Sequence, residues 1–177
     1  MTNSENKICS IIIGDDIEIE NITEGLNLDF HIHNDHIHGK INISKSSEKY
    51  LINLSNTSEK KFILDLEVII SENSFLELRD ESDYEYGSDI IISSIMNKDS
   101  IFEFFRLNNF KDDTKNTFNH NIELALNCEF RDFNFSNGSN EMDNSTTVSL
   151  NEENASYIGS GVLISNSTNS NNDLSIK

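Results

Sequence analysis

Residues 119–164 read NHNIELALNCEFRDFNFSNGSNEMDNSTTVSLNEENASYIGSGVLI, and they carry the clearest structural pattern in the chain. Apolar and polar residues alternate in short runs, and small or turn-forming residues separate these runs at nearly fixed distances. Side chains of an extended chain point alternately to opposite faces, so such runs are typical of half-buried β-strands. The stretch therefore predicts a succession of short strands joined by regular turns.

The pattern also recurs upstream, with a nearly constant period. A polar or acidic residue, a small residue and then alternating apolar residues form a degenerate repeat. Its five anchors are Glu48, Ser74, Ser100, Cys128 and Ala155, at spacings of 26, 26, 28 and 27 residues. A strand repeat of this length is typical of a solenoid, in which each coil stacks on the one before. Regular strands of a β-sandwich are the alternative, and the period favours the solenoid.

No segment shows a helical period over ten residues, so we expect an all-β chain. At 177 residues, one domain over residues 1–177 is expected. The two ends, residues 1–16 and 165–177, are expected to be less ordered than the rest.

Individual segments carry more local expectations. Residues 26–43 contain three alternating patches, with predicted breaks near Asn34-Asp35 and at Gly39. Residues 80–89 are acidic and are expected to form a turn. Residues 108–117 are polar and are expected to form a loop.

The composition excludes several classes of partner. Thirty-one acidic and thirteen basic residues give a net charge of −18, which repels nucleic-acid backbones and anionic membranes. No apolar run approaches the roughly 20 residues of a membrane span, and the first residues do not resemble a secretory signal. The two cysteines, Cys9 and Cys128, are too few for a disulfide framework. A cytoplasmic protein is therefore expected.

The sharpest chemical motif is His31-Ile32-His33-Asn34-Asp35-His36-Ile37-His38. Each His-x-His pair would share one face of a strand, with Asn34-Asp35 as a turn, and paired imidazoles are good ligands for zinc-like ions. The spacing from Gly25 also resembles the start of the cupin metal motif, although the glutamate of that motif is missing. A cupin-like metal-binding protein using these four histidines is one hypothesis. The alternative is a set of exposed polar residues on strands whose inward face carries Phe30, Ile32 and Ile37.

Other catalytic patterns are absent from the sequence. It contains no Ser-His-Asp order, no glycine-rich phosphate loop and no cysteine pair with metal spacing. Cys128 is expected to be a small buried residue at a repeat anchor, with a reactive thiolate as the alternative. No catalytic, cofactor-binding or metal-binding residue is therefore assigned, and the protein is expected not to be an enzyme.

The C-terminal third resembles the SufB/SufD family of iron–sulfur cluster assembly scaffolds. The resemblance is clearest over residues 133–173 and weaker over residues 62–86. Its elements are Phe133-Asn-Phe135-Ser136-Asn-Gly138-Ser, Val148-Ser-Leu150, Asn151-Glu-Glu-Asn-Ala155, Gly161-Val-Leu-Ile164 and Asp173. Three positions depart from the family pattern, namely Asp143 for a usual arginine, Gly159 for a usual apolar residue and Ser139 for a second glycine.

The resemblance implies a right-handed parallel β-helix, a single-stranded solenoid, which agrees with the period of about 27 residues. It implies a SufD-like non-catalytic scaffold that works with SufB-like and SufC-like ATPase partners in the assembly of iron–sulfur clusters, with no stably bound cofactor. The family's cluster-linked strand and ATPase-docking helices have no counterpart here, so no cluster residue is carried over. Because solenoid ends expose strand edges, a homo- or hetero-oligomer formed through these edges is expected.

Overall fold

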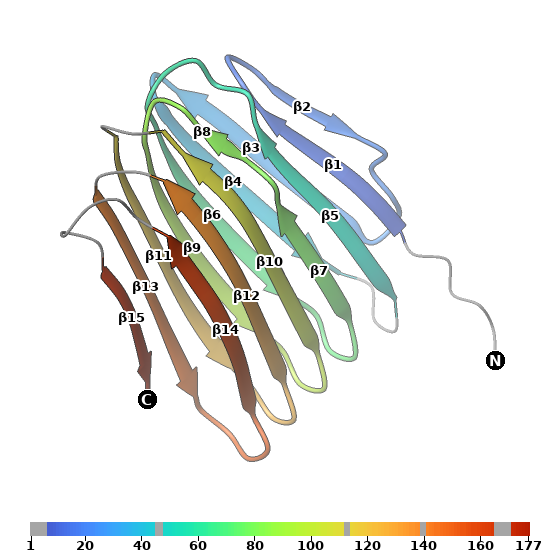
Figure 1. Ribbon diagram of the computed structural model, residues 1–177. Helices are drawn as coiled ribbons and strands as arrows, with labels where there is room; N and C mark the ends of the chain where they lie inside the picture. Colours follow the sequence, from blue (N-terminus) through green and yellow to red (C-terminus); the bar gives the residue numbers. More distant parts are fainter. Residues whose placement is uncertain (1–6, 45–47, 112–113, 139–140, 165–170) are drawn as a thin grey trace.

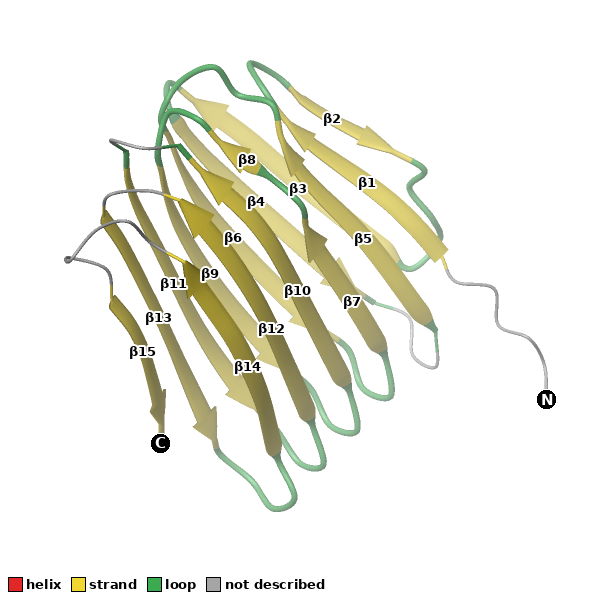
Figure 2. Cartoon of the chain, in the orientation of Figure 1, coloured by secondary structure: helices red, strands yellow, loops and turns green. Residues whose placement is uncertain are grey.

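The computed structural model describes residues 7–44, 48–111, 114–138, 141–164 and 171–177. In these residues the chain forms strands and turns and no helix, which confirms the all-β prediction. The strands lie in two layers, and the chain passes from one layer to the other along the length of the molecule (Figure 1 and Figure 2). We call the layers sheet A and sheet B.

From β9 (Ser88–Met96) onward, successive strands of the sequence belong alternately to sheet B and sheet A. In spatial order, sheet A contains β14 (Ser156–Ile164), β12 (Glu129–Gly138), β10 (Ile101–Phe110), β7 (Phe75–Asp80), β5 (Lys49–Asn56), β1 (Lys7–Ile13) and β2 (Ile17–Glu20), with β8 (Asp83–Tyr84) paired to β10. In spatial order, sheet B contains β15 (Asn171–Ile176), β13 (Glu141–Leu150), β11 (Lys115–Leu124), β9 (Ser88–Met96), β6 (Phe62–Ile70), β4 (His36–Ile43) and β3 (Leu26–His33).

Strands of successive coils pair in parallel, so each coil lies on the previous one. Leu76 lies opposite Phe102, Phe102 opposite Phe130, and Phe130 opposite Tyr157. These steps match the repeat seen in the sequence, and the predicted β-solenoid is confirmed. The sandwich alternative is wrong, since a sandwich is built from antiparallel strands.

The turns that lead from sheet B to sheet A explain the repeat. The four such turns whose residues are all described each contain one asparagine or aspartate in the left-handed region, namely Asn73 (φ 55°), Asp99 (φ 58°), Asn127 (φ 55°) and Asn154 (φ 56°). Asparagine and aspartate tolerate this conformation better than other residues with a side chain. The amide of Asn127 donates to Oδ1 of Asp99 at 2.7 Å, and Asn154 donates to Oδ1 of Asn127 at 3.1 Å. The anchors are the residues that follow, and the side chains of Ser74, Ser100 and Cys128 are buried.

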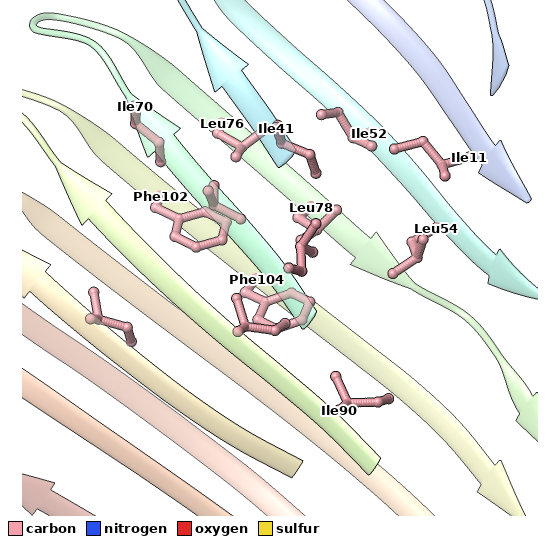
Figure 3. Close-up of a cluster of buried hydrophobic side chains, with 14 of the residues drawn as sticks. Ile11, Ile41, Ile52, Leu54, Ile70, Leu76, Leu78, Ile90, Phe102 and Phe104 are labelled. Carbon is pink, nitrogen blue, oxygen red and sulfur yellow. The ribbon is translucent and has the colours of Figure 1, made fainter. Parts of the chain in front are cut away.

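The core fills the space between the sheets. Branched and aromatic side chains from both sheets point into this space in stacked columns (Figure 3). Tyr50, Phe102, Phe104 and Phe130 are among its largest fully buried members. Complete burial of a side chain of this size contributes about 1.5–3 kcal/mol, so the columns hold successive coils together.

The N-terminal coil ends differently from the rest. β2 runs antiparallel to β1, and β3 runs antiparallel to β4, so two hairpins cover this end of the parallel stack. The predicted turn at Asn34-Asp35 is confirmed, but the predicted break at Gly39 is wrong, because this glycine lies inside β4. Phe30 lies opposite Gly39, and a Cβ atom there would lie 2.4 Å from the phenyl ring of Phe30. Gly39 therefore makes room for a neighbouring aromatic ring.

Two other local expectations are also corrected. β10 extends to Phe110 and β11 begins at Lys115, so most of the segment expected to be a loop is strand, and Asn108 and Asn116 point inward and are buried. The acidic segment 80–89 contains β8, and Tyr84 donates to Oδ2 of the buried Asp80 at 3.0 Å. At the chain ends, residues 7–13 and 171–176 form β1 and β15, whereas residues 1–6 and 165–170 lie outside the described residues.

Candidate functional site

The four histidines of the sequence motif lie together on the outer face of sheet B. In the β3–β4 hairpin His31 lies directly opposite His38, and His33 lies opposite His36. Alternation places these side chains on the face opposite to Ile37, which is buried in the core. The predicted sharing of one face by each pair is therefore confirmed.

A carboxylate from the next coil joins two of these histidines. Asp65 of β6 pairs with His38 in the parallel ladder, and its Oδ2 atom lies 3.0 Å from Nε2 of His36 and 3.7 Å from Nδ1 of His38. The two imidazole rings are stacked, with centroids 4.1 Å apart and an interplanar angle of 27°. One ligand atom from each residue lies within 4.8 Å of the others, so the three could hold one metal ion.

His31 and His33 are placed less favourably for binding the same metal ion. His31 lines a surface hollow of about 330 Å³ together with His38 and Asp65, while its Nε2 atom lies 2.9 Å from Oδ1 of Asp29. His33 belongs neither to this lining nor to the three-residue group among the described residues. Of the four predicted histidines, His36 and His38 thus lie with Asp65, and His31 lies in the same hollow. His33 belongs to neither group.

Asp65 is the residue that the sequence motif did not include. It lies 27 residues after His38, which is one period of the repeat. In a parallel solenoid, residues one period apart on outward positions become neighbours. The repeat period of the sequence could therefore have identified Asp65, whereas the local histidine motif could not.

The cupin resemblance is not matched by the fold. A cupin would enclose its histidines inside a barrel, whereas here they lie outside a two-sheet solenoid, with side-chain exposures of 38% for His36 and 54% for His38. Any metal chemistry at this place would thus be that of a surface site with an open coordination position.

Both cysteines are buried in the core, and neither forms a disulfide. The Sγ atom of Cys128 lies 3.0 Å from the carbonyl oxygen of Asn97 and 3.5 Å from the hydroxyl of Ser100. Burial raises the pKa of the Cys9 thiol, which disfavours its nucleophilic thiolate. These environments are those of structural residues.

The C-terminal coils enclose a polar interior. Arg106 donates to both carboxylate oxygens of Asp132, at 3.1 and 2.9 Å, and both side chains are almost completely buried. The guanidinium also lies 3.8 Å from the ring centroid of Phe118. Nearby, Ser94 contacts the ring of His120 at 2.8 Å, and burial lowers the pKa of this histidine well below its ordinary value.

The last coil leaves this interior open. A hollow of about 180 Å³ reaches Arg106 and Asp132 between β14 and β15, and Gly159 and Gly161 contribute to its wall. Leu174 occupies an inward position, opposite Thr146, and is 53% exposed. Ile158 and Val162, on the outer face of β14, are 50% and 52% exposed.

An apolar groove lies next to this end, on the outer face of sheet A. Phe105 and Phe133 stack there with ring centroids 4.8 Å apart. Together with Leu107, Phe135 and Val162 they line a hollow of about 470 Å³. The groove runs across β10, β12 and β14 and is continuous with the open end.

No protein-family model, curated protein or solved structure matches this chain. Among the described residues, no helix has the length and apolar character needed to cross a membrane. The described residues form a two-sheet parallel β-solenoid whose N-terminal end is capped by two antiparallel hairpins.

Proposed function

We propose that the protein is a non-catalytic cytoplasmic scaffold that pairs with a second β-solenoid subunit through its C-terminal edge. The observation that carries this proposal is the last coil. β14 and β15 each pair with one strand only among the described residues, and their apolar side chains are exposed. An unpaired strand edge is a template for strand addition by another chain.

The charges on the two ends support the same conclusion. β14 contains no charged residue and β15 contains one, Asp173, in a chain with a net charge of −18. The edge strands at the other end carry Glu18 and Glu20 on β2 and Asp29 on β3. Charged residues on edge strands discourage pairing, so β14 is the edge strand that lacks this protection.

The resemblance to the SufB/SufD family suggests the partner. The residues that carry it, 133–173, include the later part of β12, all of β13 and β14, and the start of β15. On this basis the partner is a SufB-like solenoid, and the pair works with a SufC-like ATPase in iron–sulfur cluster assembly. A second copy of this chain is the less favourable partner, because two surfaces of charge −18 repel each other.

Co-purification with SufB-like and SufC-like subunits tests the proposal. The variant Ile158→Lys/Val162→Lys places charges on β14 and is expected to weaken capture at least about tenfold. The matched control is Ile91→Lys/Ile95→Lys on β9, where the side chains are 37% and 42% exposed in the middle of sheet B. Equal capture by the two variants, or no capture by the unaltered chain, would contradict the proposal. If light scattering shows a homodimer, the partner is a second copy of this chain and not a SufB-like subunit.

A further inference from the structure

We propose that His36, His38 and Asp65 bind one divalent transition-metal ion of the zinc class on the outer face of sheet B. This inference is independent of the proposed scaffold function. It rests on three side chains that come from two successive coils and converge at one point. β4, β6 and the β3 strand beside them lie next to one another in the sheet (Figure 1).

The distances fit a tetrahedral ion. Two ligand atoms that each lie about 2.1 Å from a tetrahedral zinc ion are roughly 3.4 Å apart. The separations of 3.0 Å and 3.7 Å from Oδ2 of Asp65 to the two imidazole nitrogens lie on either side of this value. All three ligand atoms lie within 4.8 Å of one another, so side-chain rotations would bring them to the distances around one ion.

The ligand types select the class of ion. Two imidazole nitrogens and one carboxylate oxygen suit zinc, cobalt and nickel, whereas calcium and magnesium prefer sites made of oxygen ligands. Three protein ligands also leave one position for water or an exogenous ligand, as in open zinc sites. His31 lines the same hollow and lies directly opposite His38 in the strand register.

The surroundings do not oppose a bound cation. Lys40 is the cationic residue in the lining of the hollow, and its Nζ atom lies 2.7 Å from Oε2 of Glu67. Asp29 lies in the same lining and contacts His31. A cation at the three ligands therefore meets carboxylates and a lysine that is already paired.

Zinc titration of untagged, chelator-treated protein tests the proposal, with isothermal calorimetry as the readout. We expect one zinc ion per chain and a higher thermal unfolding midpoint, because the ion would join two coils of the folded state only. His36→Ala and Asp65→Asn should each raise the dissociation constant by more than the roughly 10- to 100-fold loss that removal of an outer-shell partner causes. Calcium and magnesium at the same concentrations should produce neither effect.

His33→Ala is the matched control, since it removes an imidazole from the same face of the same hairpin. It should leave zinc affinity within about threefold of the unaltered protein. The absorption spectrum of cobalt-loaded protein reports metal coordination directly. It should change in the Asp65→Asn variant and stay unchanged in the His33→Ala variant. The proposal is overturned if stoichiometric zinc binding is absent, if Asp65→Asn binds as tightly as the unaltered chain, or if His33→Ala loses as much affinity as His36→Ala.

Discussion

The two ends of the solenoid differ in how they finish the stack of coils. At the N-terminal end, β2 and β3 turn back antiparallel and cover an interior of isoleucine and leucine. At the C-terminal end, β14 and β15 continue the parallel winding and border an interior that contains Arg106, Asp132 and Asn134. A hairpin that reverses direction can close a solenoid, whereas a coil that continues the winding leaves a surface to be covered. Among the described residues, the antiparallel hairpins therefore cover an apolar interior, whereas the last parallel coil borders a polar one.

The largest expected difference in stability is between loss of the buried Arg106–Asp132 ion pair near the C-terminal end and loss of the exposed Lys40–Glu67 ion pair near the N-terminal end. Asp132→Ala should lower the free energy of unfolding by about 3–5 kcal/mol, because it leaves Arg106 charged and buried without its carboxylate. Glu67→Ala removes the exposed partner of Lys40 and should cost at most about 1 kcal/mol. Urea denaturation measures both. Equal losses in the two variants would show that the interior pair is solvated in the folded protein.

A comparison of inward apolar residues at the two ends should give the next largest effect. Ile11→Ala in the capped end should lower the free energy of unfolding by about 2–5 kcal/mol, since its side chain is fully buried. Leu174→Ala in the last coil should change it by no more than about 0.5 kcal/mol, since that side chain is largely exposed. The measurement is the urea midpoint at constant slope. A large loss for Leu174→Ala would mean that the open end is covered in solution.

The smallest expected effect is a pH dependence of the free energy of unfolding, caused by His120 at the boundary between the apolar and the polar interior. Burial lowers the pKa of His120 well below its ordinary value of about 6.5, so the unfolded chain binds a proton that the folded chain excludes. Stability should therefore fall as the pH drops below about 6.5, by up to about 1.4 kcal/mol per pH unit from this residue. Urea denaturation at pH 6.5 and pH 5.5 measures the loss. His120→Gln should show a smaller pH dependence, whatever its absolute stability, and an unchanged slope would contradict the assignment.

The parts of the fold that repeat were predictable from the sequence. Asn73, Asp99 and Asn127 each precede a small buried residue, and the left-handed turn conformation favours asparagine or aspartate at these positions. The antiparallel cap was not predictable in the same way, because β3 and β4 alternate apolar and polar residues just as parallel strands do. Strand direction depends on the connection, and alternation carries no information about it.

The polar interior was missed for a different reason. Asn108, Asn116 and Asp132 occupy inward positions, but a pattern based on hydrophobicity treats such residues as outward or as loop. Asn108 is held by Oδ2 of Asp80 at 3.1 Å, and such contacts between coils become visible only once the coils are stacked. The histidines of the candidate metal site were predicted, because they form a local sequence motif. Asp65 was not predicted, because it lies in the following coil. The iron–sulfur role and its partners stay predictions.

The residues Asn73, Asp99, Asn127 and Asn154, at one corner of four successive coils, have a consequence for the evolution of the chain. Because Asn127 bonds to Asp99 and Asn154 to Asn127 through equivalent atoms, neighbouring coils are interchangeable at that corner. Removal or duplication of a segment that runs from one such residue to the next would preserve both the corner and the alternation of the strands. An insertion of a few residues inside a strand would preserve neither. The molecule is therefore suited to become longer or shorter in whole coils, with the distance between its two ends set by how many it has.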